Sequence, residues 1–575
     1  MHDLVISDAL IVDGTGRAGY HGDVAVENGR IVRVGGKAGA AKREIRAGGA
    51  VLTPGFVDVH THYDAQMRWD PYLSSSSWHG VTSLVFGNCG VGFAPARPER
   101  RDWLIGLMES IEDIPGATLR EGIRWDWESF PEFLDAIEQS KLAIDVGAQI
   151  PHAALRTYVM TERGATNQPA TEDDLRAMSA LVREAMAAGA LGFTGSRSIN
   201  HRHLDGSNAP GYGLDTAEVT ALARAAGEGG GGRGCVGFIV DFEDVDREIA
   251  WLRGVSRASG LPVWCLLTQS YEHPHKWARV LELMAQASAA GEPLYAQVPG
   301  RPIGNMLGLK SSRNPFFLHP SFRTIAGLPV EQQVARLRDS AFRAQLLSEK
   351  PDAPTESLRS VTGRFDRMFR LGDPPDYEPS PENSIDAIAR AQGRAPAEVA
   401  LDIMLERDGN ELLFLPMTNY VDGNLDVTLK MLRHPNALLG LSDGGAHVSR
   451  VCDASTPTYM LAHWARDRKR GPTMPLEEAV RLQTSRTAAF FGLSDRGVLA
   501  PGKKADLNLI DFDRLRLCAP EMVHDLPGKA KRLVQRAEGY VATVVSGVPV
   551  FENGEATGAM PGALIRGKRG DKPPR

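Results

Sequence analysis

Short apolar runs alternate with amphipathic stretches along most of this chain. Eight runs have the length and β-former content of strands: GFVDVHTH, TSLVFGNC, AIDVGAQI, ALGFTGS, CVGFIVD, PVWCLLTQ, LLFLPM and ALLGLSD. Stretches with helical periodicity lie between them, at residues 172–189, 216–227, 276–290 and 475–491. Alternating strands and helices predict an α/β protein, and eight strands predict that residues 53–494 close into a parallel (β/α)8 TIM barrel.

The two ends of the chain have a different pattern. Residues 1–52 contain short strands and an Asn28-Gly29 hairpin signal, without room for a crossover helix. Residues 495–558 repeat this pattern around Asn553-Gly554. We therefore expect both ends to form one small discontinuous β-sandwich into which the barrel is inserted. The remaining residues, 559–575, are basic and predict a poorly packed tail.

Residues 298–380 interrupt the barrel pattern. The segment begins with Pro, Gly and aromatic residues and continues with EQQVARLRDSAFRAQLLSEK, which has the pattern of an amphipathic helix. Long insertions at a strand end are typically functional loops or lids. Two adjacent Phe residues favour an ordered lid here.

Composition limits the classes of function. The net charge of −6 provides no basic surface for nucleic acid, and no apolar run is long enough to span a bilayer. The N-terminus lacks the features of a signal peptide, so we expect a cytoplasmic protein with a small-molecule substrate. Five widely spaced cysteines argue for reduced thiols. Homo-oligomerisation is compatible with the expected sheet edges, but no sequence feature demonstrates it.

A histidine pair follows the first predicted barrel strand. His60 and His62 are two residues apart in GFVDVHTH, and the strand period of two places both side chains on one face. Two imidazoles at the end of a barrel strand can share a metal ion. A single His is more often a packed or solvated side chain, and it is the pairing that favours a metal site.

Two further residues end predicted strands. Asp443 ends the last strand, before small residues and His447, although Asp in SDGG is also a common turn former. Cys89 ends the second strand in FGNCG, where a buried Cys is ordinarily a small apolar side chain. With the histidine pair they provide N, S and O ligands, a set that suits zinc better than magnesium or calcium.

The segments PGFVDVHTHYD and FGNCGVGFAP, together with patterns from DLVISDALIVDGTG to GAMPGALIRG, resemble the amidohydrolase superfamily. The Cys-containing loop is similar to that of the N-acyl-D-amino-acid deacylase (D-aminoacylase) family. The resemblance implies a barrel flanked by a discontinuous sandwich and a zinc centre with Cys89 as a ligand. It also implies that Asp443 binds metal and acts as general base.

The chain departs from that family at the fifth and sixth strands. The family has a His after each, which hold a second metal, whereas this chain has none after the fifth and Thr268-Gln269 after the sixth. The family's substrate-binding lysine also lacks a counterpart. We therefore expect one zinc ion, with a second left open. Candidate substrate contacts are His447, Tyr295, His201, His203 and Gln269. His201 and His203 lie in the loop after the fourth strand, where a solvated His is the more common case, but either could also replace a missing ligand.

The leading hypothesis is a zinc-dependent hydrolase of a C–N bond in an N-acyl amino acid or a related small amide. One alternative is a reaction of the same superfamily on a lactone, carbamate or specialised metabolite, including a non-hydrolytic step. The other is a catalytically degenerate barrel retained for binding.

Overall fold

The computed structural model describes residues 1–213, 216–353 and 355–567. Its centre consists of parallel strands in two hydrogen-bonded runs, β6-β7-β8 and β9-β10-β11-β12-β13-β17. Their bounds are β6 (Phe56–Asp58), β7 (Val81–Phe86), β8 (Asp145–Ala148), β9 (Ile150–Pro151), β10 (Gly192–Ser196), β11 (Cys235–Ile239), β12 (Val263–Leu266), β13 (Leu294–Val298) and β17 (Ala437–Leu439). β8 and β9 are two parts of one strand, separated by Gln149.

The barrel closes where the ends of its first and last strands meet. The backbone N–H of Asp443 donates to the His60 carbonyl (3.2 Å), and that of His62 donates to the Gly444 carbonyl (2.7 Å). Thr61 and Gly444 form a parallel bridge at the same place. The predicted α/β barrel is thus present, with eight strand positions once β8 and β9 are counted as one.

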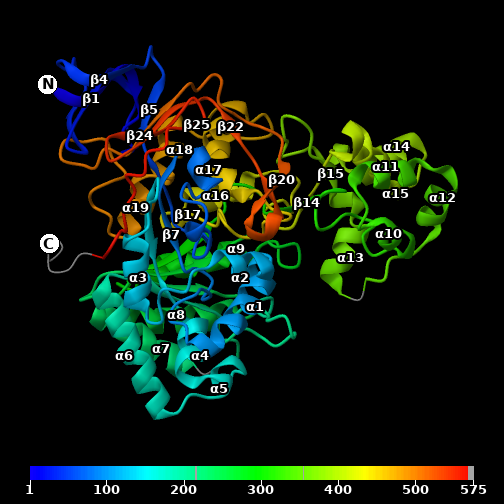
Figure 1. Cartoon of the computed structure of the whole chain (residues 1–575), viewed down its shortest axis with the longest axis horizontal. Helices are drawn as coiled ribbons and strands as arrows, with labels where there is room; N and C mark the ends of the chain where they lie inside the picture. The colour runs from blue at the N-terminus through cyan, green and yellow to red at the C-terminus, as the bar shows by residue number, and fades with distance from the viewer. Residues whose placement is uncertain (214–215, 354, 568–575) are drawn as a thin grey trace.

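Helices connect successive strands, as Figure 1 shows. The connections after β7, β9, β10, β11 and β12 contain α1 (Arg101–Glu112), α2 (Gly116–Gly122), α3 (Phe130–Glu138), α4 (His152–Met160), α5 (Glu162–Ala165), α6 (Glu172–Ala188), α7 (Thr216–Gly229), α8 (Val245–Ser259) and α9 (Lys276–Ala289). α16 (Asp426–Arg433) precedes β17, and α17 (Thr456–Tyr459), a π-helix (Met460–Asp467), α18 (Leu476–Leu482) and α19 (Ser485–Phe490) follow it. The single helix predicted at 475–491 is therefore two, separated at Gln483. None of the described helices is both long and apolar enough to cross a membrane.

The seventh barrel strand corrects the sequence prediction. LLFLPM was expected there, but β16 (Leu413–Pro416) pairs antiparallel with β14 (Gly304–Leu307) and β15 (Phe369–Arg370), outside the barrel. The seventh strand is β13, parallel to both β12 and β17. Because a short apolar run carries no mark of its partner strands, the two candidates could not be distinguished by pattern alone.

Strands from both ends of the chain form one sheet, in the order β25-β24-β23-β18-β5-β1-β2-β3, with β4 beside β1. Their bounds are β1 (His2–Ile11), β2 (Tyr20–Glu27), β3 (Arg30–Val34), β4 (Ala41–Arg46), β5 (Val51–Pro54), β18 (Leu507–Ile510), β23 (Tyr540–Val545), β24 (Val548–Glu552) and β25 (Glu555–Ala556). Two small pairs lie apart from it: β19 (Arg516–Leu517) with β22 (Ala537–Glu538), and β20 (Glu521–Leu526) with β21 (Ala530–Val534). Buried apolar residues from both ends share one core, as the discontinuous domain requires.

The insertion between β13 and β17 is a subdomain with its own core, which stands to one side of the barrel in Figure 1. Besides β14, β15 and β16 it contains α10 (Pro320–Ile325), α11 (Val330–Arg338), α12 (Ser340–Ser348), α13 (Glu356–Gly363), α14 (Ile385–Gln392) and α15 (Pro396–Met404). Its core extends from Leu307 to Leu415, so the predicted bound at 380 is too early. The amphipathic stretch at 331–350 is two helices, because Asp339 ends α11 and caps α12.

The C-terminal segment is better packed than predicted. The N–H of Ile565 donates to the Val146 carbonyl (2.6 Å) and that of Val146 donates to the Ala563 carbonyl (3.1 Å), so the chain runs along β8. Arg566 forms ion pairs of 2.7 Å with Asp135 and Glu138. Residues 568–575 of the predicted basic tail lie outside the described residues.

A buried ion-pair cluster connects the barrel to the terminal sheet. Arg496 donates to Asp145 on β8 (2.6 Å) and to Ser83 on β7 (2.7 Å), and its guanidinium lies 3.7 Å from Asp506, which precedes β18. Lys504 provides the second cation, 3.3 Å from Asp506. Because both acids are buried, their charges depend on these two cations.

We expect Arg496→Met to destabilise the protein by about 3–5 kcal/mol, because it leaves Asp145 and Asp506 with one cation between them. The measurement is the thermal unfolding midpoint at a fixed scan rate. The matched control is Arg516→Met, which removes an exposed pair with Glu538 and should change the midpoint little. Equal midpoints for the two variants would contradict a stabilising role for the cluster.

Candidate metal centre

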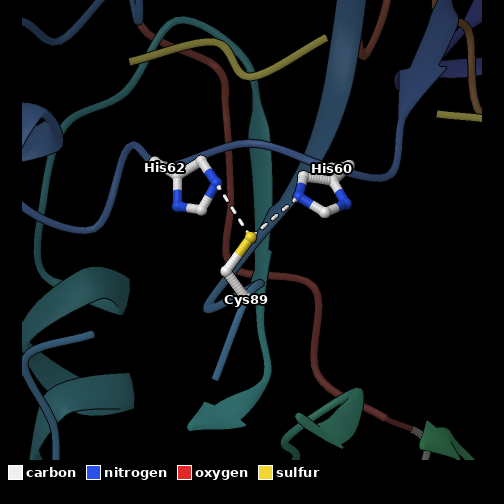
Figure 2. Close-up of side chains that lie close together, drawn as sticks. All are labelled: His60, His62 and Cys89. Atoms are coloured by element: carbon white, nitrogen blue, oxygen red, sulfur yellow. Dashed lines mark hydrogen bonds between the residues drawn. The ribbon is translucent and has the colours of Figure 1, made fainter. Parts of the chain in front are cut away.

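Two imidazoles and a thiol meet at the end of the first two barrel strands. His60 and His62 follow β6, and Cys89 follows β7. The Cys89 Sγ lies 3.4 Å from His60 Nε2 and 3.8 Å from His62 Nε2, and Figure 2 shows the sulfur between the two rings. All three residues are buried, and their ligand atoms lie within 4.8 Å of one another.

Asp443 joins this group from the last barrel strand. Its Oδ1 lies 3.6 Å from the Nε2 atoms of both His60 and His62. The Ser442 hydroxyl, which donates to Asp58 (2.5 Å) and to the His60 carbonyl (3.2 Å), fixes the turn that carries Asp443. The four residues expected to bind metal are therefore brought together by the closure of the barrel.

Three residues at this site have strained backbones. Cys89, Asp443 and His447 have φ values of +57°, +47° and +50°, in the left-handed region that residues other than Gly rarely adopt. Such strain tends to concentrate at functional sites, where the surrounding structure compensates for it. Gly90, beside Cys89, is required for packing: a Cβ there would lie 2.6 Å from the Gly195 Cα. Gly90 therefore allows the Cys89 loop to lie against β10.

The histidines are held in the form that binds metal. His60 Nδ1 is 2.7 Å from Gln297 Oε1, so its N–H donates to the amide and the Nε2 lone pair faces the sulfur. Burial lowers the pKa of His60 to about 4 and that of His62 to about 3. Both imidazoles are therefore neutral at pH 7, as metal ligands must be.

The acids of the site lack a compensating protein cation. Burial raises the pKa of the Cys89 thiol well above its usual range, and the Glu112, Asp443 and Asp64 carboxyls raise it further. Burial also raises the pKa of Asp64 to about 7. Among the described residues, no Lys or Arg forms an ion pair with any of the three carboxylates. A bound cation would supply the missing positive charge.

The donor spacing also suits a metal. Zinc bonds of roughly 2.0–2.3 Å place tetrahedral ligands about 3.3–3.8 Å from one another. The measured His–Cys and His–Asp separations of 3.4–3.8 Å lie in this interval. One S, two N and one O donor is a set that zinc binds well. His60, His62 and Cys89 therefore form a group that could hold a metal ion, and Asp443 lies beside the two histidines.

Glu112 is a member of the site that the sequence reading missed. It ends α1, is 2% exposed, and places its Oε2 3.5 Å from His62 Nε2 and 3.8 Å from His447 Nε2. The indication in the sequence was its position: Ile105, Met108 and Glu112 share one face of α1, where an acid interrupts an otherwise apolar stripe. Every ligand predicted from the sequence was at a strand end, whereas Glu112 lies at the end of a helix.

Two of the other predicted histidines lie beside the centre. His447 Nε2 is 3.9 Å from Asp443 Oδ2. His201 accepts or donates a hydrogen bond with Ser196 Oγ (2.8 Å). Burial lowers the pKa of each to about 4, with the Asp443 charge opposing this in both. Both are therefore neutral polar groups near Asp443 at pH 7.

The remaining predicted substrate contacts have other roles in the structure. Tyr295 packs edge-on against Phe490, at 5.1 Å between ring centroids. It precedes Gln297 by two residues, about 6–7 Å toward the amino end of β13 and away from the site. His203 stacks on Trp103 of α1, at 5.1 Å. These contacts give Tyr295 and His203 packing roles, and their predicted contact with substrate stays a prediction.

Gln269 forms hydrogen bonds with neighbouring loops. Its amide donates to Asp422 (3.0 Å) and to the Pro274 carbonyl (3.3 Å). Its backbone N–H donates to Asn419 (2.7 Å), so the residue connects the end of β12 to the segment that follows the insertion. This bonding gives Gln269 a role in loop packing, and its predicted contact with substrate stays a prediction.

A small polar cavity adjoins Asp443. Its volume of about 30 Å³ is enough for roughly two water molecules. Polar side chains from several elements line it: Gln66, Ser74, Asp453, Arg532 and Gln535. Water could therefore stand next to the Asp443 carboxylate in this conformation, whereas a larger ligand needs additional space.

The insertion contacts the loop that carries His447. The N–H of Met306 on β14 donates to the Arg450 carbonyl (2.8 Å), and Ser449 Oγ lies 2.8 Å from Ser312 Oγ. Ser449 also donates to Asp113, which follows Glu112 (2.5 Å). The base of the insertion is thus part of the border of the site.

The chain is a (β/α)8 barrel protein with a cluster of His, His, Cys and Asp side chains at its strand ends. Residues 43–551 match the model of the amidohydrolase family, and the chain belongs to that family. It is 28% identical to an uncharacterized protein of Mycobacterium tuberculosis, covering 97% of this chain and 93% of that one. It is 24% identical to the D-aminoacylase of Alcaligenes xylosoxydans xylosoxydans, covering 98% and 97%.

A solved structure shares the fold. The N-acyl-D-glutamate deacylase of Bordetella bronchiseptica, in complex with zinc and a phosphonate inhibitor, aligns with a TM-score of 0.65 and 22% identity. The alignment covers 98% of this chain and 99% of that one. The alignment therefore extends over nearly the full length of both chains.

We expect Gln297→Leu to weaken zinc binding by about 10–100-fold, because His60 loses the acceptor that fixes its ring and tautomer. Zinc affinity is measured by competition with a chromophoric chelator. Gln286→Leu, an exposed amide on α9, is the matched control and should bind zinc as the wild type does. An unchanged affinity in Gln297→Leu would remove Gln297 from the support of the centre.

Proposed function

We propose that this protein is a zinc-dependent hydrolase that cleaves the amide bond of an N-acyl amino acid or a related small amide. The observation that supports it most is the cluster of His60, His62, Cys89 and Asp443, whose separations of 3.4–3.8 Å suit one zinc ion. Membership of the amidohydrolase family and the likeness to D-aminoacylase support the reaction class.

The mechanism assigns the proton transfers to Asp443. Zinc, when bound, lowers the pKa of a bound water to ~7 and polarises a substrate carbonyl. Asp443 accepts a proton from the attacking water as its oxygen bonds to the carbonyl carbon. The carboxyl then gives this proton to the amide nitrogen as the C–N bond breaks. The acyl group leaves as a carboxylic acid that keeps the second proton of the water, the amine leaves with the first, and Asp443 is again ionised.

Two arginines near His447 are candidates to bind a substrate carboxylate. Arg450 follows His447 in a turn, and its Nε lies 3.3 Å from Asp113. Arg313, from the insertion, is part-buried, and both burial and the neighbouring Arg450 lower its pKa. Asp113 already supplies one anion to this pair, since it pairs with Arg450 and raises the pKa of Arg313, and a substrate carboxylate would be a second. This pair favours an acidic substrate such as an N-acyl amino acid.

A second candidate is a reaction of the same family on another bond. The chain has no His at the ends of β11 and β12, so its site differs from that of the family it resembles. A lactone, a carbamate or another specialised metabolite would suit such a remodelled site, and a non-hydrolytic step remains open. A non-catalytic binding role is the third hypothesis, and a protein without metal and turnover would favour it.

Asp443→Asn should lower kcat by at least about 10²-fold, because the amide cannot accept the proton of the attacking water. Turnover of an N-acyl amino acid panel is measured alongside metal content and circular dichroism. Asp173→Asn, an exposed carboxylate on the outer helix α6, is the matched control and should retain activity. Full turnover in a folded Asp443→Asn variant would refute the proposed general base.

Arg313→Met should raise KM for N-acyl amino acids by about 10–100-fold, because a charged hydrogen bond of roughly 1.5–3 kcal/mol is lost. The corresponding N-acyl amines, which lack the carboxylate, should be affected little. Arg323→Met, exposed on α10, is the matched control. If KM rises equally for both substrates, or the wild type prefers neutral esters, lactones or carbamates, the substrate assignment is wrong.

A further inference from the structure

Ser196 is a buried residue at the end of the fourth barrel strand, β10, and its hydroxyl fixes the tautomer of His201. The Ser196 Oγ accepts a hydrogen bond from the Ser198 N–H (3.3 Å) and lies 2.8 Å from His201 Nδ1. Among the described residues, no other acceptor is bonded to this hydroxyl. Because a buried O–H without an acceptor costs free energy, the hydroxyl donates to Nδ1. The proton of the neutral imidazole is therefore on Nε2.

The Nε2–H of His201 is a donor without a partner in the protein. No described residue forms a hydrogen bond or an ion pair with this nitrogen, and protein atoms do not enclose it. The residue is half-buried, so a bound molecule can reach the N–H. Burial lowers the pKa of His201 to about 4, while the Asp241 and Asp443 charges oppose this change. A neutral imidazole at pH 7 can donate a hydrogen bond and keep its proton.

The backbone holds His201 beside the metal centre. Gly90 follows Cys89, and a Cβ on Gly90 would lie 2.8 Å from the Ser196 backbone nitrogen. The Cys89 loop therefore packs directly against the residue that bonds His201. The Ala209 N–H donates to the His201 carbonyl (2.9 Å), which ties the far side of the loop to the same point. The loop thus has a fixed path next to the thiol of the centre.

The other imidazoles of the site lack an accessible donor. The N–H of His60 already donates to an amide oxygen (2.7 Å). The Nδ1 atoms of His62 and His447 are enclosed by protein atoms. The Nε2 of His447 faces a carboxylate oxygen of Asp443 at 3.9 Å. Of these histidines, His201 is the one that can offer an N–H to an oxygen of the substrate.

We propose that His201 is a catalytic residue whose Nε2–H stabilises the oxyanion of the tetrahedral intermediate, and that Ser196 is the positioning residue that fixes its tautomer. As the water oxygen bonds to the carbonyl carbon, the C=O π electrons move to the carbonyl oxygen, and the resulting anion accepts the hydrogen bond. When the C–N bond breaks, this electron pair forms the C=O bond again. His201 keeps its proton throughout. The proposal rests on the proposed amide hydrolysis and adds a donor to the proton transfers of Asp443.

The test separates substrate binding from stabilisation of the intermediate. The zinc-loaded full-length protein and its variants are assayed with the N-acyl amino acid that the wild type hydrolyses fastest. His201→Leu should lower kcat by about 10²–10³-fold and change KM by less than about threefold, because the donor acts on charge that develops in the transition state. His201→Gln, whose amide N–H can still donate, should recover at least about tenfold of this loss. His21→Gln, exposed on β2 of the terminal sheet, is the matched control and should keep the wild-type kcat.

Two further readouts do not depend on turnover. A phosphonate analogue of the tetrahedral intermediate should bind His201→Leu about 10²-fold more weakly, because it carries the charge that the donor recognises. The ¹⁵N spectrum of the imidazoles should show His201 protonated on Nε2 in the wild type and a mixture of both tautomers in Ser196→Ala. This second variant should also lower kcat by roughly 3–10-fold without changing KM, since part of the protein then presents a lone pair to the oxyanion.

Folding and zinc content are measured for every variant, by circular dichroism and elemental analysis. If His201→Leu does not fold, His201→Gln and Ser196→Ala decide the question. Loss of zinc from a folded His201 variant would make the residue a ligand and overturn its role as a donor. An unchanged kcat, or a rise in KM alone, would also overturn that role, while amide hydrolysis by the wild type would leave the proposed function standing. A zinc-loaded wild type that neither hydrolyses N-acyl amino acids nor binds the phosphonate would overturn both.

Discussion

The contact between the first and last barrel strands is the constraint on which the site depends. Two backbone hydrogen bonds join Asp443 to His60 and His62 to Gly444. The same bonds close the barrel and bring the Asp443 carboxylate to 3.6 Å from two imidazoles. Residues at opposite ends of a long domain therefore converge without a flexible connection, and the ligand geometry has the rigidity of the sheet.

The other residues of the site have two features that cost free energy, a strained backbone and buried acids. Cys89, Asp443 and His447 all have positive φ values, and the structure buries acids beside them without a protein cation. Neither feature stabilises the chain by itself. Both become understandable if a metal compensates for them, since it binds the side chains that the strained backbones direct inward. Stability and metal binding are therefore coupled at this point of the fold.

The sequence predicted most of the architecture because period and spacing carry that information. The alternation of apolar runs and amphipathic stretches predicted the barrel, and the two hairpin signals predicted strands at both ends of the chain, which form one sheet. The seventh strand was wrong because LLFLPM and LYAQV are both short apolar runs, and only long-range pairing distinguishes them. Glu112 was missed because its partners come from β6 and the loop after β17. A helix pattern shows that an acid is buried but does not show which groups surround it.

Charge balance limits how the centre can be occupied. Ionised Cys89 and Asp443 carry two negative charges, which one divalent cation neutralises; the imidazoles beside them are neutral at pH 7. An ionised Glu112 then adds a charge that no described Lys or Arg compensates. Burial and the neighbouring Asp443 and Asp64 carboxyls raise the pKa of Glu112 well above its usual range. A positive charge bound beside Glu112 would lower this pKa again, so the protonation of Glu112 and the occupation of the centre are linked.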